Sequence, residues 1–140
     1  MKINDESTQQ LFSHFDQAKG CEFHYIYGCI QASVLKSIFL GHLASFANKF
    51  FLLGFTKSSL IMIRVSLTGK FQDPKIMLYS DFKRVKTSGW MFGIGKKINI
   101  ELNDGKKIKL KINKRVGGLK KQKENLIAVC DMLSTINCNF

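Results

Sequence analysis

Prolines and cysteines are scarce in this chain of 140 residues, and each scarcity excludes a class of protein. One proline argues against a linker-rich or fibrous protein, and four cysteines are too few for a disulfide scaffold. Cys21, Cys29, Cys130 and Cys138 lack the short spacing of zinc ligands, so we expect reduced thiols, as in a reducing cytosol. The hydrophobic share of 45% nevertheless suffices for the core of one globular domain.

Long apolar runs are also missing. The most membrane-like stretch, Ile38–Phe55, is interrupted by His42, Asn48 and Lys49, whereas a spanning helix needs about 20 apolar residues. The N-terminus has no apolar run behind a basic start, so we expect no secretory signal. These features predict a cytoplasmic protein that is able to lie peripherally at the inner face of a membrane.

Positive charge is what the sequence has in excess. Its 22 Lys and Arg against 10 Asp and Glu give a net charge of +12. Residues 71–140 hold fifteen basic and six acidic residues, whereas residues 1–70 hold seven and four. A field of this sign attracts anionic membranes, acidic proteins and nucleic acids, although a solvated basic surface is the plain alternative.

Apolar spacing predicts a helix at each end of the chain and strands between them. Residues 7–19 form a short amphipathic pattern that Ser7 or Thr8 is suited to cap, and Leu119–Ile136 carries a broad apolar stripe. Between them the sequence predicts about seven short strands, which favours a sandwich or barrel with the last helix plugging one end. Two of these strands are Ile76–Tyr79 and Phe82–Thr87, with a corner or bulge at Ser80-Asp81. Ser33–Asn48 fits either a short helix or a long hairpin tip.

The register of one hairpin follows from its sequence. Apolar and polar residues alternate over Lys97–Asn113 around Asn103-Asp104-Gly105. A three-residue loop sets Ile100 opposite Ile108 and keeps one face apolar, whereas a two-residue turn would mix the faces. We therefore predict a type I turn with Gly105 in the left-handed region, as in a G1 bulge.

Three segments carry a resemblance to a known family. They are the apolar strand Phe50–Thr56 followed by Leu60–Ile63, the segment Leu78–Val85, and the basic hairpin followed by a helix that opens Leu119–Gln122. In these patterns, residues 20–136 resemble bacterial pleckstrin-homology-like (PH-like) domains of uncharacterised proteins.

The resemblance implies a mainly β fold with a C-terminal helix: a seven-stranded bent antiparallel barrel, preceded here by a short N-terminal helix. It divides the chain into a helical extension, residues 1–19, and a PH-like domain, residues 20–140. The resemblance specifies a fold more than an activity. Eukaryotic relatives bind phosphoinositides through basic early loops, and we do not transfer that site because the early loops here are weakly basic.

No catalytic constellation emerges from the sequence. His14, His24 and His42 have no recognisable nucleophile or acid–base partner, and the few acidic residues are scattered. The glycines at 89, 93 and 95 do not have the spacing of a phosphate loop. We therefore expect no enzymatic activity, no metal and no cofactor.

Two groups of residues are candidates for binding. Alternate residues of a strand share a face, so outward lysines of the last hairpin are expected to form one stripe. The predicted basic face consists of Lys96, Lys97, Lys107, Lys109, Lys111, Lys114 and Arg115. Trp90 and Phe92 are predicted interface aromatics, for a membrane or for stacked bases, with closure of the barrel as the alternative.

We interpret the chain as a non-enzymatic binding or adaptor module whose basic face meets an anionic membrane surface or an acidic protein. Two alternatives stay open at this point. One is a self-assembly module, a homo-oligomer that pairs through exposed barrel edges. The other is a weak nucleic-acid binder.

Overall fold

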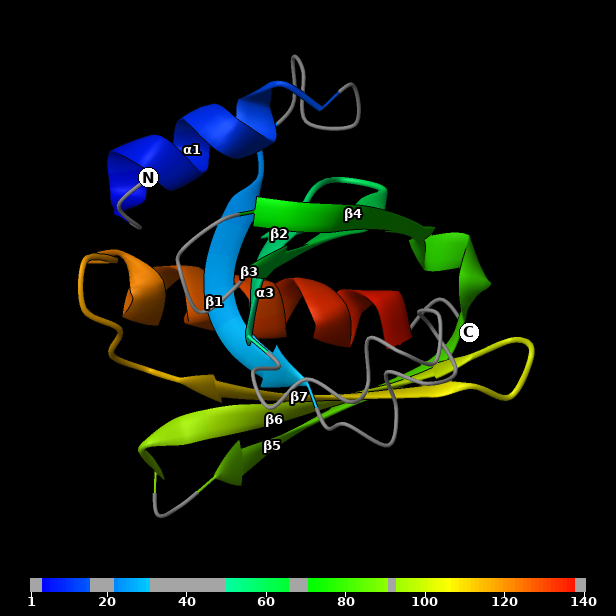
Figure 1. The fold of residues 1–140 in the computed structure, drawn as a ribbon. Helices are drawn as coiled ribbons and strands as arrows, with labels where there is room; N and C mark the ends of the chain where they lie inside the picture. The colour runs from blue at the N-terminus through cyan, green and yellow to red at the C-terminus, as the bar shows by residue number, and fades with distance from the viewer. Residues whose placement is uncertain (1–3, 16–21, 31–49, 66–70, 91–92, 138–140) are drawn as a thin grey trace.

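A computed structural model describes residues 4–15, 22–30, 50–65, 71–90 and 93–137. Within these residues, two α-helices, a short 3-10 helix and seven strands follow one another (Figure 1). Their bounds are α1 (Asp5–Ser13), β1 (His24–Ile30), β2 (Phe50–Phe55), β3 (Ser59–Val65), β4 (Phe71–Leu78), η2 (Tyr79–Asp81), β5 (Phe82–Trp90), β6 (Gly95–Leu102), β7 (Lys107–Asn113) and α3 (Gln122–Asn137).

The seven strands form one antiparallel sheet in the order β4-β3-β2-β1-β7-β6-β5. The sheet bends so that α3 crosses between the half made by β1–β4 and the half made by β5–β7 (Figure 1). The fold is thus mainly β, with the bent seven-stranded arrangement and C-terminal helix that were expected. The barrel is open, because among the described residues β4 and β5, at the two ends of the sheet, each pair on one side only.

The main core lies between α3 and the concave face of the bent sheet. Apolar side chains that alternate along the strands point to this face, because successive residues of a strand face opposite ways. From α3, the buried residues Leu126, Val129 and Leu133 pack into it. Burial of this stripe is what stabilises the helix, since isolated helices of this length are marginal in water.

The hairpin of β6 and β7 has the predicted register. Ile100 pairs with Ile108, and the Gly105 amide donates to the Leu102 carbonyl oxygen at 3.0 Å. Gly105 has φ of +90°, in the left-handed region that favours glycine. The prediction of a three-residue loop is therefore confirmed, because only this loop gives the hairpin one apolar face.

The structure corrects the bounds of several predicted elements. Helix α1 spans Asp5–Ser13 rather than residues 7–19. It starts earlier because Asn4 caps it: Asn4 Oδ1 accepts from the Ser7 amide at 2.8 Å. Helix α3 starts at Gln122 rather than at Leu119, which lies in a preceding turn bridged to Val116. The strands predicted over 76–79 and 82–87 are longer, spanning Phe71–Leu78 and Phe82–Trp90, with the predicted corner between them formed by η2.

Helix α1 covers the convex face of the β1–β3 half of the sheet. Its Phe12 is fully buried in a second apolar cluster with Tyr25, Leu52 and Ile61. The Tyr25 hydroxyl donates to Asp5 Oδ1 at 2.8 Å, and burial together with this bond raises the pKa of the phenol. The N-terminal helix is therefore held on the sheet by apolar packing and by the hydrogen bond from Tyr25 to Asp5.

The contact of Phe12 with Gly54 makes this docking testable. A Cβ at residue 54 would lie 2.7 Å from the Phe12 ring, closer than atoms pack. We expect Gly54→Ala to lower the free energy of unfolding by about 1–3 kcal/mol, the usual cost of overpacking. Phe12→Leu should cost less in the Gly54→Ala background than alone, because the smaller side chain makes room. Urea unfolding of the four proteins measures this coupling, and strictly additive costs would contradict the contact.

The polar side chain of Gln122 joins the two halves of the sheet. Among the described residues, strands β1 and β7 pair at Cys29–Lys111 and Ile30–Leu110, and they diverge toward the start of β1. In the gap, Gln122 Nε2 donates to the carbonyl oxygens of Tyr27 and Asn113, both at 3.0 Å, and its Oε1 accepts from the Tyr27 amide at 3.1 Å. The buried amide of Gln122, at the start of α3, thus supplies hydrogen bonds where β1 and β7 no longer pair with each other.

Some sequence-based predictions fall outside the described residues. They are the alternatives for Ser33–Asn48, the role of Phe92 and the role of the Trp90 side chain. Within the described part of the chain, no helix has the length and apolar character needed to cross a bilayer.

Candidate anion-binding surface

The convex face of β5–β7 carries the cations that the sequence predicted for one stripe. Lys97 pairs with Lys111 and Glu101 pairs with Lys107 across β6 and β7, so these side chains share the face opposite to the buried isoleucines. Lys86 and Lys109 flank Asn99 from its two neighbouring strands. We call this surface the outer basic face, which consists of Arg84, Lys86, Lys97, Lys107, Lys109 and Lys111.

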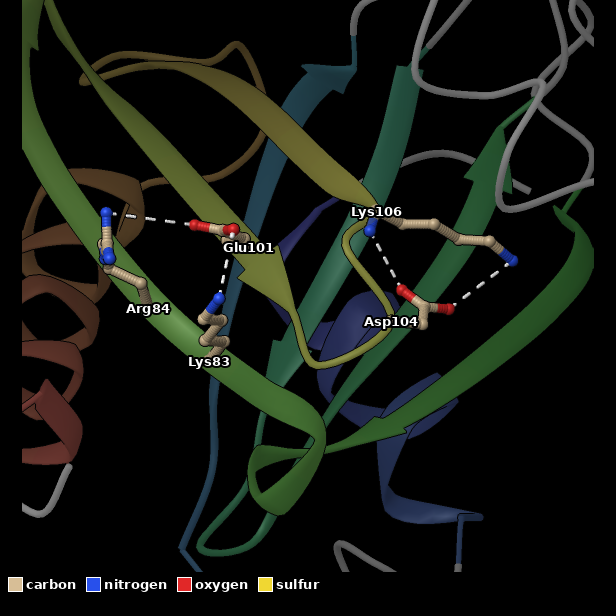
Figure 2. A network of polar contacts seen from close by, with 5 residues as sticks. All are labelled: Lys83, Arg84, Glu101, Asp104 and Lys106. Carbon is tan, nitrogen blue, oxygen red and sulfur yellow. Dashed lines mark hydrogen bonds and ion pairs between the residues drawn. The ribbon is translucent and has the colours of Figure 1, made fainter.

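Only one acidic residue interrupts this face within the three strands, and cations surround it. The register shifts between Phe82 and Arg84, and Lys83 and Arg84 both reach Glu101 (Figure 2). The Glu101 carboxylate lies 3.9 Å from Lys83 Nζ and 4.0 Å from Arg84 Nη1. Such exposed pairs contribute little to stability. The six cations of the outer basic face less the one carboxylate of Glu101 leave a net charge of +5 on this face.

The centre of the outer basic face is hollowed. A depression of about 210 Å³ lies among side chains of all three strands, with Arg84 and Lys86 on one side and Lys107 and Lys109 on the other. Asn99 lies between the two pairs and adds a neutral amide, and Glu101 also lines the depression. The face therefore presents cations on both sides of a shallow depression, which suits an anionic surface or group better than an apolar ligand.

Three residues of the predicted basic face lie elsewhere, and two of them, Lys96 and Lys114, lie together. Lys96 pairs with Ile112 and thus points to the side of the sheet opposite to Lys97, toward α3. There it lines a hollow of about 170 Å³ together with Lys114, which follows β7, and Lys123 of α3. We call these three residues the lysine corner; the sequence did not indicate that Lys123 would join Lys96 and Lys114.

Arg115 lies in a third place, a groove on the convex side where β1 and β7 diverge. This groove of about 450 Å³ is also lined by Lys111, Tyr27 and Phe50. The rings of Tyr27 and Phe50 stack with centroids 5.6 Å apart and an interplanar angle of 7°. Lys111 therefore links the outer basic face to an aromatic groove.

Two members of the outer basic face, Arg84 and Lys86, were not predicted from the sequence. The signal was present, because a strand was predicted over residues 82–87 and these two residues alternate with the buried Val85. The sequence alone does not show that β5 pairs with β6, so it does not place these two cations beside the lysines of the hairpin.

Chemically, the surface is equipped for electrostatic binding. Among the residues that the structure describes, no three His, Cys, Asp or Glu side chains gather as they would around a metal ion. Cys130 lies at the lysine corner, where burial raises the pKa of its thiol while the ammonium group of Lys96 opposes that rise.

A scan against protein-family models and a search of curated proteins found no match to this chain.

Proposed function

We propose that this protein is a non-enzymatic binding module whose outer basic face meets an anionic phospholipid surface. The observation that carries the proposal is the register of β5–β7, which sets six cations on one face with a single carboxylate among them. We also propose, on the sequence resemblance and the strand arrangement, that the chain is a member of the PH-like family.

The expected binding is long-range and sensitive to salt. Each Lys or Arg near an anionic membrane contributes about 1 kcal/mol, and the potential is screened over about 8–10 Å at physiological ionic strength. Several simultaneous contacts on the outer basic face would thus give appreciable affinity without a specific pocket. An acidic protein is negatively charged like an anionic bilayer, but its surface must match the shape of the outer basic face. A fluid bilayer adapts to the shape of that face.

The alternative of self-assembly through sheet edges receives less support. The edge strand β4 contains Pro74 and Lys75, and the edge strand β5 contains Lys83 and Lys86. Proline and lysine on edge strands oppose the addition of another strand. A second copy would also bring the same cations against each other.

A single-stranded nucleic acid is the second candidate, and one observation favours it. The stacked pair of Tyr27 and Phe50 lies beside Lys111 and Arg115. Bases stack on aromatic side chains while cations hold the phosphates. Phe50 is partly exposed, as stacking requires.

Vesicle flotation across a salt series tests the proposed function. We expect the full chain to float with vesicles of phosphatidylcholine and phosphatidylglycerol at low salt, and to stay behind with vesicles of phosphatidylcholine alone. Because the attraction is electrostatic, binding should fall steeply as salt rises. Absence of binding to anionic vesicles at low salt would contradict the proposal. Tight binding to single-stranded DNA in that case would favour the second candidate.

A further inference from the structure

The lysine corner brings three cations together from three separate parts of the chain. Lys96 comes from the start of β6, Lys114 follows the end of β7, and Lys123 lies in the first turns of α3. The hollow among them, about 170 Å³, has the volume of five or six water molecules at about 30 Å³ each. This is room for one phosphate group, which has five heavy atoms.

In the described part of the protein, these three ammonium groups have no ion-pair partner. Within residues 4–15, 22–30, 50–65, 71–90 and 93–137, no carboxylate forms an ion pair with Lys96, Lys114 or Lys123. Asp131 lies at the hollow, beyond ion-pair distance from them. An anion bound in the hollow would supply the counter-charge that these lysines lack.

Exposed aliphatic side chains lie at the same place. Ile127 lines the hollow and is 54% exposed, and Ile94 is 57% exposed. The Ile94 carbonyl oxygen accepts from the Lys114 amide at 2.9 Å, so the backbone of Ile94 lies beside that of Lys114. These are the two largest exposed fractions among the large hydrophobic residues that the structure describes.

We propose that the lysine corner, with Ile94 and Ile127, is the part of this protein that enters an anionic phospholipid interface. Lys96, Lys114 and Lys123 bind the phosphate of one lipid headgroup, and the two isoleucines reach the acyl boundary. The combination is that of an interfacial anchor, in which cations meet headgroups while apolar side chains are buried below them. The inference rests on the proposed function. It adds a second, short-range contact on the side of the sheet opposite to the outer basic face, which a flat bilayer meets in a different orientation of the protein.

A phospholipid interface accounts both for the three lysines and for the two exposed isoleucines. A soluble phosphate would satisfy the three lysines but would leave Ile94 and Ile127 in water. An apolar protein partner would cover the isoleucines but would bury three lysines without counter-charges, which is costly. Only an amphipathic anionic surface removes the apolar side chains from water and neutralises the lysines together.

Matched pairs of variants separate the corner from the rest of the surface. Ile94→Gln/Ile127→Gln removes the apolar part, and Ile76→Gln/Leu78→Gln removes two exposed aliphatic residues of β4 as the control. The lysine pair compares Lys96→Gln/Lys114→Gln/Lys123→Gln with a control of equal net charge, Lys57→Gln/Lys75→Gln/Lys106→Gln. Flotation with vesicles of phosphatidylcholine and phosphatidylglycerol is measured at low and at high salt. Thermal unfolding verifies that every variant is folded.

We expect the Ile94→Gln/Ile127→Gln protein to bind about tenfold more weakly than its control at high salt, where apolar insertion outlasts screened attraction. At low salt it should still float. The corner lysine variant should bind more weakly than its charge-matched control. If each variant binds as well as its matched control, the proposed role of the lysine corner is wrong and the proposed function is unaffected. Failure of the wild-type protein to bind anionic vesicles at all would overturn both.

Discussion

Reversing three charges on the outer basic face should weaken binding to anionic vesicles by more than about 100-fold. The variant is Lys86→Glu/Lys97→Glu/Lys109→Glu. Each change removes an attraction of about 1 kcal/mol and adds a repulsion of similar size, so the three together exceed the roughly 2.7 kcal/mol of a 100-fold effect. Vesicle flotation at low salt measures the loss.

These three positions are chosen because the fold should tolerate the change. In the sheet register, Lys97 faces Lys111, and Lys86 and Lys109 both neighbour Asn99, so no new carboxylate is paired directly with Glu101. The Lys97→Glu change even replaces a pair of like charges across β6 and β7 with an attractive pair. The matched control is Lys57→Glu/Lys75→Glu/Lys106→Glu, which makes the same change in net charge away from this face. If the control loses as much binding, net charge rather than the outer basic face determines the attraction.

Replacing Gln122 by alanine should lower the free energy of unfolding by about 2–4 kcal/mol. The substitution leaves the Tyr27 amide and the carbonyl oxygens of Tyr27 and Asn113 without their partner where β1 and β7 separate. A buried polar group that loses its hydrogen bond costs about 1–3 kcal/mol, and water entering the gap offsets part of the sum. Urea unfolding monitored by circular dichroism gives the difference.

The control for this prediction is Asn99→Ala, which removes an exposed amide from the middle of β6. Surface substitutions of this kind usually change stability by about 0.5 kcal/mol or less. Equal stability of the Gln122→Ala and Asn99→Ala proteins would mean that Gln122 does not join the two halves of the sheet.

The parts of the fold that could be predicted are those set by neighbouring residues. Alternation around Asn103-Asp104-Gly105 predicted the hairpin register, because only one loop length keeps Ile100 and Ile108 on the same face. The start of α3 could not be found in this way. Leu119 fits the apolar stripe but is buried from a turn before the helix, and the helix starts where Gln122 reaches across to β1. Contacts between residues so distant in sequence leave no local pattern.

The candidate surface likewise has a part that could be predicted from neighbouring residues and a part that could not. Lys97 and Lys111 share a face through alternation and pairing in one hairpin, so they could be grouped from the sequence. Lys96 could not be separated from Lys97 as a surface residue, because the position of α3 determines what lies on the other side of β6. The lysine corner depends on three segments that meet only in the folded chain.

The most direct test of the central claim, that the outer basic face contacts anionic lipid, is lysine acetylation footprinting by mass spectrometry with and without anionic vesicles. Bound lipid should lower the reactivity of Lys86, Lys97, Lys107 and Lys109, and it should leave Lys57 and Lys75 unchanged. Phosphatidylcholine vesicles should protect none of them. Protection of Lys57 and Lys75 with free reaction of the lysines on β5–β7 would contradict the account, because the membrane would then lie against another face.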